Sequence, residues 1–412
     1  MNTKRRILTA VATVAIFANG LAPLAFAGTT ITISGNAADS DNDVVVNNTQ
    51  NTSVNQTNDA DFDNNIDGDA NTGGNDANQN NGGDVNVQTG DASVNVTVEN
   101  SANQNWASID CCTQGDTELK IGGNAADSNN TINLDVDNKV DVDQDNDAWF
   151  DNDVKYLDAK TGDNDANQNN GGDVNIQTGD ASVTVAVSNW ANANSARIGS
   201  NGDGSSLSLK ILNNAADSDN DILVDLNSTT DVDQDNYADF DNNIDGDANT
   251  GGNDANQNNG GDVLIDTGDA SVDVSVDNMA NFNWADLNCG CLFGEGGLEV
   301  LVEGNGYNSD NNVNGDFDSD QDADQDNDAW FDNDVKYLDA KTGDNDANQN
   351  NSGGNGDPSV ETGDADVNVD VSNSANTNGI GGDEPEWPEW NWGGLNISIS
   401  FDLGDLLDAL SL

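Results

Sequence analysis

The chain has 412 residues, of which 76 are Asp or Glu, 11 are Lys or Arg and none is His. Its formal net charge of −65 repels nucleic acid and anionic lipid and favours cations as partners. The absence of His excludes Ser-His-Asp and Cys-His catalysis, and carboxylates are too abundant for any pair to indicate an acid–base site. We therefore expect a protein that is not an enzyme.

The N-terminus has the pattern of a secretory signal peptide. The basic residues Lys4–Arg6 precede an apolar stretch, Ile7–Phe26, and small residues stand just before Gly28. We predict that residues 1–27 are removed on export and that the protein is secreted or held at the cell surface. Removal leaves eight Lys or Arg and all 76 acidic residues, a formal net charge of −68. No later segment is apolar enough to predict a membrane span in the mature chain.

Three short motifs recur along the rest of the chain at intervals close to 90 residues, which is typical of tandem repeats. They begin at Asn36, Ala77 and Thr89, and they recur at Asn124, Asn214, Ala166, Ala255, Ala347, Thr178, Thr267 and Thr362. The repeats alternate in type, because residues 60–85 are identical to 238–263 and residues 143–170 are identical to 324–351. We divide the chain into repeats A1 (28–123), B1 (124–213), A2 (214–303) and B2 (304–380), followed by a C-terminal segment (381–412).

Apolar residues alternate with polar ones on both sides of each Thr-Gly-Asp motif. In A1 the apolar positions are Val85, Val87, Ala92, Val94, Val96 and Val98, and B2 keeps Val367, Val369 and Val371. An alternation with period two predicts strands that bury one face, and the central Gly suits a turn that needs positive φ.

A longer pattern in B1 predicts a strand with one acidic face. One face holds Ile132, Leu134, Val136, Val140 and Val142, and the other holds Asp135, Asp137, Asp141 and Asp143. In B2, Asp occupies every second position from 316 to 328. A helix would scatter these residues around its circumference, whereas a strand gathers them on one side.

Two all-β architectures fit these repeats. In a β-solenoid, short strands stack repeat on repeat, and Asn, Gly and Asp form the corners. Repeats of this length also suit a string of small β-sandwiches, but each repeat has few large apolar residues for a closed two-sheet core. We therefore favour the β-solenoid. Low hydrophobicity with high charge would also fit a disordered chain, against which the strict periodicity argues.

The most specific chemical prediction is a Ca²⁺ site in each A repeat. Asp and Asn alternate before a Gly, as at the start of an EF-hand loop, and Ca²⁺ takes about six to eight hard oxygen ligands. The twelfth position is Gly74 or Gly252 instead of Glu, so an intact EF-hand is not expected. The candidate ligands are Asp63, Asn65, Asp67 and Asn71 in A1 and Asp241, Asn243, Asp245 and Asn249 in A2. Cations bridging the Asp faces of stacked repeats are a further hypothesis, and screening by monovalent salt is its alternative.

The turns at Thr72–Asp76 and Thr161–Asp165 distantly resemble the Gly/Asp-rich turns of RTX calcium β-rolls. As a whole, the chain resembles Asn/Asp/Gly-rich secreted surface repeat proteins of bacteria. The first resemblance covers short turns only, since the nine-residue RTX repeat is not present in register. The second implies a role at the cell surface or in a matrix, and it assigns no functional residue.

Four cysteines are disulfide candidates, because an exported chain meets an oxidising environment. They are Cys111 and Cys112 in A1 and Cys289 and Cys291 in A2, at corresponding places of the two repeats. Three pairings are open, and we favour local or intermolecular bonds over a bond between the repeats. The spacing of these cysteines and the lack of His argue against a Zn²⁺ site.

The C-terminal segment departs from the repeats. Trp387, Trp390 and Trp392 lie close to two prolines, and the apolar stretch Phe401–Leu412 follows. We expect a cap over the last repeat, because terminal repeats need one. The alternative is an aromatic platform that binds a sugar or a partner chain.

The leading hypothesis is an exported acidic structural or adhesive repeat protein of the cell surface or extracellular matrix, stabilised by Ca²⁺. Divalent cations are its expected partners, together with surface glycans or other copies of the chain. One alternative is a module that binds carbohydrate or ice through regular Asn and Thr arrays. Another is a disordered acidic chain that binds cations.

Overall fold

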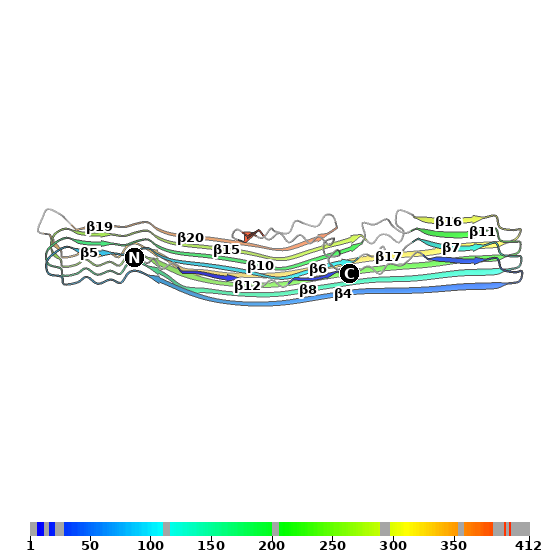
Figure 1. Cartoon of the computed structure of the whole chain (residues 1–412), viewed down its shortest axis with the longest axis horizontal. Coiled ribbons are helices and arrows are strands. Elements are labelled where there is room, and N and C mark those ends of the chain that lie inside the picture. Colours follow the sequence, from blue (N-terminus) through cyan, green and yellow to red (C-terminus); the bar gives the residue numbers. More distant parts are fainter. Residues whose placement is uncertain are drawn as a thin grey trace, which may run out of the picture.

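The computed structural model describes residues 29–109, 116–199, 206–288, 297–352 and 358–381, and the backbone of residues 6–11, 16–20, 391–392 and 395–396. In these parts of the chain every regular element is a β-strand and none is a helix, which confirms the all-β prediction. The strands lie side by side in an elongated, layered stack (Figure 1).

The longest strands form one parallel sheet with the order β4-β8-β12-β17. Its members are β4 (Asp41–Asn71), β8 (Asn129–Lys160), β12 (Asp219–Asn249) and β17 (Asp310–Lys341). Each residue pairs with its counterpart in the next repeat, as Asp41 pairs with Asn129 and Asn129 pairs with Asp219. One strand therefore comes from each repeat, and the repeats follow one another in chain order.

Three further parallel sheets also take one strand from each repeat when B1, A2 and B2 are counted from residues 117, 207 and 298, where a short strand precedes each sequence boundary. The names A1, B1, A2 and B2 follow this structural count from here on. They contain β3 (Thr30–Ser34), β7 (Thr117–Gly122), β11 (Leu207–Leu212) and β16 (Leu298–Glu303); β5 (Val85–Gln88), β9 (Val174–Gln177), β14 (Val263–Asp266) and β19 (Ser359–Glu361); and β6 (Ala92–Ile109), β10 (Ala181–Gly199), β15 (Ala270–Asn288) and β20 (Ala365–Ile380). Among the strands of residues 29–381, every pairing joins one repeat to the next.

Six short strands complete the set. They are β1 (Arg6–Val11), β2 (Ile16–Gly20), β13 (Asn259–Gly260), β18 (Asn351–Ser352), β21 (Asn391–Trp392) and β22 (Leu395–Asn396). Strand β13 pairs with β18, and β21 pairs with β22. Strands β1 and β2, which fall within the predicted signal peptide, pair in parallel with the outer edge of β6.

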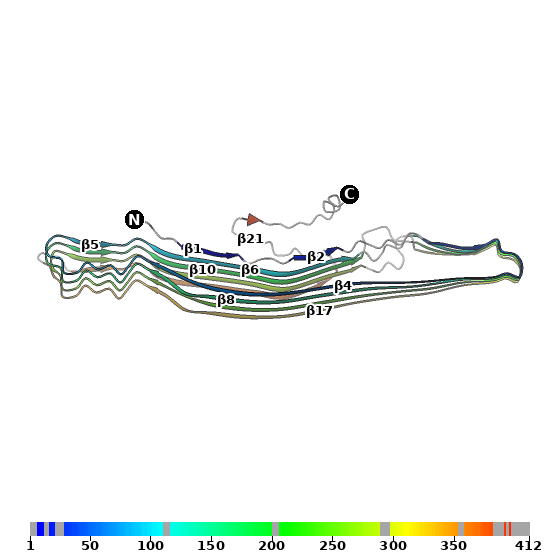
Figure 2. The same ribbon diagram turned by 60° about the horizontal axis from the view of Figure 1, so that its bottom comes forward.

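Each repeat runs out along one layer and returns along another. In A1 the chain passes from β3 into β4, reverses after Asn71, and returns through β5 and β6 (Figures 1 and 2). The sheets that contain β4 and β6 face each other, and the apolar core lies between them.

Burial follows the predicted alternation. The six apolar positions of A1 around Thr-Gly-Asp are at most 7% exposed. In B2, Val367, Val369 and Val371 are 45, 50 and 40% exposed, because β20 is the last strand of its sheet. In β8 the predicted apolar face is buried and the four predicted Asp residues point outward. The period-two reading is therefore confirmed, and the loss of burial in B2 comes from its terminal position.

Residue Asn103 marks a feature that the alternation did not predict. It has φ of 62°, in the left-handed region that Asn tolerates better than most residues. The inward positions are even-numbered before it, as at Val98 and Asn100, and odd-numbered after it, as at Asn105 and Ala107. The same conformation recurs at Asn192, Asn281 and Asn376. One residue per repeat thus changes which side chains enter the core.

Candidate functional site

The outer face of the β4-β8-β12-β17 sheet carries columns of carboxylates. Stacking places equivalent outward residues on neighbouring strands, which lie about 4.8 Å apart in a sheet. Two columns have Asp in all four repeats. The Asp63 column consists of Asp63, Asp151, Asp241 and Asp332, and the Asp69 column consists of Asp69, Asp158, Asp247 and Asp339.

Shorter columns lie further along the same face. One contains Asp143, Asp233 and Asp324, and the next contains Asp145, Asp235 and Asp326. Desolvation by the surrounding sheet raises the pKa of Asp235 to about 6, and the charges of Asp233 and Asp145 add to the shift. The carboxylates are therefore close enough to oppose one another's ionisation.

The Asp63 column has the same electrostatic character. Desolvation raises the pKa of Asp241, and the neighbouring charges of Asp151 and Asp332 raise it further. The pKa of Asp151 is also raised, first by desolvation and then by Asp153 and Asp63. A cation placed beside this column would relieve the repulsion.

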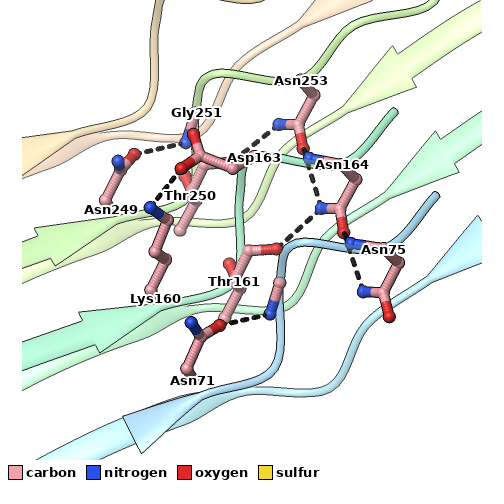
Figure 3. A network of polar contacts seen from close by, with 11 residues as sticks. Asn71, Asn75, Lys160, Thr161, Asp163, Asn164, Asn249, Thr250, Gly251 and Asn253 are labelled. Atoms are coloured by element: carbon pink, nitrogen blue, oxygen red, sulfur yellow. Dashed lines mark hydrogen bonds and ion pairs between the residues drawn. The ribbon is translucent and has the colours of Figure 1, made fainter. Parts of the chain in front are cut away.

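Lysines neutralise part of the face in the B repeats. Lys155 Nζ lies 2.6 Å from Asp153 Oδ1, and Lys341 Nζ lies 2.5 Å from Asp339 Oδ2. Lys160 forms an ion pair with Asp163 across the turn that follows β8 (Figure 3). The Asp63 column contains no basic residue, so its charges are compensated only by neighbours to the side.

The structure places the predicted Ca²⁺ ligands along strands and not in loops. Asp63, Asn65 and Asp67 occupy alternate outward positions of β4, and alternate residues of a strand are about 6.7 Å apart. Ca²⁺ ligands lie about 2.3–2.6 Å from the ion, so these residues do not converge on one ion in this conformation. Asp241, Asn243 and Asp245 lie in the same way on β12. What the structure does bring together is each Asp and its counterparts in neighbouring repeats.

The last predicted ligand of each set caps a turn. Asn71 Oδ1 accepts a hydrogen bond from Gly73 N at 2.9 Å, and Asn249 Oδ1 accepts one from Gly251 N at 2.9 Å (Figure 3). Asp245 Oδ1 likewise accepts from Tyr156 N at 2.5 Å. The two Asn oxygens hold the backbone where β4 and β12 end, and Asp245 holds the backbone of β8 at Tyr156. In the described parts of the chain, no group of three or more acidic side chains forms a ready-made metal site.

The other predicted site residues lie outside the described side chains. Cys111, Cys112, Cys289 and Cys291 fall between described segments, and Trp387 and Trp390 fall after the last repeat. Trp392 belongs to β21, which is described by its backbone only.

Sequence reasoning missed a set of buried amide ladders. In the central ladder, Asn64, Asn152, Asn242 and Asn333 from the long strands interleave with Asn100, Asn189, Asn278 and Asn373 from the facing sheet. Asn152 Oδ1 accepts from Asn64 Nδ2 at 2.8 Å and from Asn100 Nδ2 at 2.8 Å. Its Nδ2 donates to Asn189 Oδ1 at 3.2 Å and to Asn242 Oδ1 at 2.7 Å. Both lone pairs and both protons of this buried amide are thus used.

Further ladders follow the same rule. The Asn58 ladder contains Asn58, Asn146, Asn236 and Asn327 on the long strands and Asn105, Asn194, Asn283 and Asn378 on the facing sheet. At the turn, Asn75 Nδ2 donates to Asn164 Oδ1, and Asn164 Nδ2 donates to Asn253 Oδ1, each at 2.8 Å (Figure 3). The alternation along the strand could have revealed these ladders, because Gln144 and Asn146 occupy the same inward-facing, even-numbered positions as Val140 and Val142.

Comparison with protein-family models, curated proteins and solved structures gives no match for this chain. Within the described residues, no helix has the length and apolar character needed to cross a membrane.

Proposed function

We propose that the chain is an exported acidic structural or adhesive repeat protein of the cell surface or extracellular matrix. Its four repeats form a β-solenoid, and Ca²⁺ stabilises the stack by binding to the outer carboxylate columns. The observation that carries the proposal is the Asp63 column, in which four equivalent Asp residues lie on successive strands without an intervening base.

The solenoid is supported by the pairing pattern. Every strand of residues 29–381 pairs in parallel with its equivalent in the next repeat, and the buried amides bond along the same direction. A string of separate sandwiches would pair strands within each repeat instead. A long, regular stack with polar outer faces suits a structural element that displays one surface many times.

The cation role is supported by distance and charge. An ion with Ca–O distances of about 2.3–2.6 Å reaches oxygens on two carboxylates whose strands are about 4.8 Å apart. Water would supply the remaining ligands, so each bridge is weak. Binding in the range of about 10⁻⁴–10⁻³ M is typical of extracellular Ca²⁺ modules. Many weak bridges on one face together offset the self-repulsion of the chain.

The test measures the thermal unfolding midpoint by circular dichroism under two conditions. One is 5 mM EDTA (about the usual chelator excess), and the other is Ca²⁺ at roughly ten times that concentration. We expect a strand spectrum and an unfolding midpoint that rises with Ca²⁺ more than with Mg²⁺ or with matched ionic strength. The variant Asp241→Asn removes one carboxylate from the Asp63 column and should reduce the Ca²⁺ effect. Asp277→Asn is its matched control, because Asp277 pairs with Ser188 and Ser372 and has no acidic neighbour in its column.

A midpoint that responds equally to Ca²⁺ and to monovalent salt would refute the Ca²⁺ role, since screening alone would then account for it. The same holds if Asp241→Asn and Asp277→Asn behave alike. A chain without any strand signal, with or without cations, would overturn the solenoid as well.

A further inference from the structure

The two ends of the stack differ from its interior. In A1, β3, β4 and β5 pair on one side only, and in B2 the strands β16, β17, β19 and β20 do the same. Val300 and Val369, on the inward positions of B2, are each 50% exposed, whereas Val274 in A2 is 3% exposed. Unpaired parallel edges that carry apolar side chains are templates for another chain.

The A1 end has an unused acceptor. Asn58 is 5% exposed, and its Oδ1 accepts no hydrogen bond from the described residues. Its counterpart in B1, Asn146, has an Oδ1 that accepts from Asn58 Nδ2 at 2.8 Å and from Asn105 Nδ2 at 2.9 Å. A buried carbonyl without a donor is costly, so the A1 end lacks the partner that each inner repeat has.

The B2 end has the matching unused donor. Asn236 Nδ2 in A2 donates to Asn283 Oδ1 at 2.7 Å and to Asn327 Oδ1 at 2.9 Å. In B2, Asn327 Nδ2 donates to Asn378 Oδ1 at 2.5 Å, and within the described residues its second proton has no acceptor in a following repeat. The Asn58 ladder therefore ends in an acceptor at A1 and in a donor at B2.

The two ends also carry much of the same sequence as the B1–A2 interface inside the stack. Repeat B1 contacts A2 through β8 and β12 over 30 paired positions. Residues 143–170 of B1 recur unchanged as 324–351 of B2, and residues 238–263 of A2 recur unchanged as 60–85 of A1. A B2 end meeting an A1 end would thus repeat the B1–A2 contact over these stretches, with Phe331 opposite Phe62. Just before the identical stretch, Asn58 is the counterpart of Asn236, so Asn327 would lie opposite Asn58 as Asn146 lies opposite Asn236.

We propose that the B2 end of one molecule docks onto the A1 end of a second copy in the register that joins B1 to A2. This contact is heterologous and does not close, so it generates filaments. It also places Asp332 beside Asp63 of the next copy, so assembly requires that charge be screened or neutralised. The inference goes beyond the proposed function, because it concerns the ends of the stack and holds for any cation. It does rest on the stacked repeats of that proposal.

The edge of β6 is occupied by residues of the predicted signal peptide. Strand β1 pairs with residues 94–99 of β6, and β2 pairs with residues 104–108. These are the positions that β20 of another copy would use. Removal of residues 1–27 on export therefore opens the A1 end, and the chain to test is the exported one, residues 28–412.

Two glycines allow assembly to be blocked without disturbing the single molecule. A Cβ on Gly162 would lie 1.9 Å from Gly251 O, but a Cβ on the equivalent Gly343 of B2 meets nothing within 4 Å. In a filament it would strike Gly73 O of the next copy. A Cβ on Gly268 would lie 2.6 Å from Asp180 Oδ1, and one on the equivalent Gly90 of A1 meets nothing within 4 Å. Gly343→Ala thus blocks the B2 end, and Gly90→Ala blocks the A1 end.

The experiment follows assembly by sedimentation and electron microscopy across a range of protein concentration, at low salt and with added Ca²⁺ or at pH 5. We expect the unsubstituted chain to form filaments once charge is screened. Each variant alone should stay monomeric at about ten times the threshold concentration, which corresponds to a loss of about 1.4 kcal/mol at the interface. An equal mixture of the two variants has one intact pair of ends, so it should form dimers that do not grow. Ser372→Ala, at an outward position of β20, should assemble normally.

Three outcomes overturn the proposal. The first is a chain with a strand spectrum that stays monomeric under all conditions; the docking then fails while the stacked fold stands. The second is filaments that form equally well from both glycine variants. The third is assembly only by a chain that ends at Gly381, which would make the C-terminal segment the occupant of the B2 end. Loss of the strand spectrum would instead refute the stacked fold on which the docking rests.

Discussion

The central amide ladder gives the sharpest test of how the repeats hold together. Asn152 is fully buried, accepts two hydrogen bonds and donates two. The substitution Asn152→Asp keeps its shape and both accepted bonds; of the two donated bonds it keeps at most one when the carboxyl is protonated and neither when it is ionised. It also places a titratable carboxyl in the core.

The cost follows from these two changes. The protonated carboxyl loses one donated hydrogen bond, which is worth about 1 kcal/mol. An unfolded Asp has a pKa of about 3.9, and each pH unit above it at which the core keeps the carboxyl protonated costs about 1.4 kcal/mol. At pH 7.5 this adds about 5 kcal/mol, and at pH 4.5 it adds about 1 kcal/mol. The folded pKa of the new carboxyl is raised, so its cost grows as the pH rises.

Urea unfolding followed by circular dichroism at the two pH values measures the difference. Asn133→Asp is the matched control, because Asn133 lies outward on the same strand, and surface changes of this kind are usually within about 0.5 kcal/mol. We expect Asn152→Asp to lose about 4 kcal/mol more at pH 7.5 than at pH 4.5, relative to that control. Equal behaviour of the two variants at pH 7.5 would refute a buried amide ladder.

Two further predictions concern charge and close packing. The pKa of Asp235 is raised from an ordinary 3.8 to about 6. The folded state therefore gains stability from protonation of Asp235 in full below about pH 3.8, and it loses that stability as the pH rises through about 6. The cation-free protein should therefore unfold at a higher temperature at pH 5 than at pH 7.5. Asp235→Asn should stabilise it at pH 7.5 by about 1 kcal/mol after screening, and a variant that leaves the pH profile unchanged would contradict this. Gly251→Ala should destabilise the fold by about 3 kcal/mol, because its Cβ would lie 1.9 Å from Gly343 O. Gly343→Ala should leave the melting temperature unchanged, and equal melting of the two variants would contradict the close approach.

Alternation predicted the strands and their faces well, because a strand repeats with period two and β-branched residues mark the buried side. Ile132, Leu134 and Val136 illustrate this on β8. The switch at Asn103, from even-numbered to odd-numbered inward positions, could not be predicted in the same way. It depends on one residue in a left-handed conformation, which composition does not reveal.

The Ca²⁺ loop was predicted from Asp63, Asn65 and Asp67 alone, without their neighbours. Phe62, Asn64 and Ile66 alternate with them, and all three pack inward. Their packing keeps the chain extended, so the acidic residues lie in a row. The columns can be recognised only once the register between strands is known, because equivalent Asp residues are 88–92 residues apart in the sequence.

The buried amides and the outward carboxylates lie on opposite faces of the same strands and have different effects on the stack. A buried Asn is satisfied only by another amide at the same height in the next repeat, so a shift in register would leave its protons and lone pairs unpaired at a cost of about 1–3 kcal/mol each. The ladders thus fix the register without needing large apolar side chains. Fixing the register in turn stacks every outward Asp on its equivalents, as along the Asp63 column. The order of the interior therefore creates the repulsion on the outer face, and what neutralises that face sets how stable the stack is and whether its open ends join.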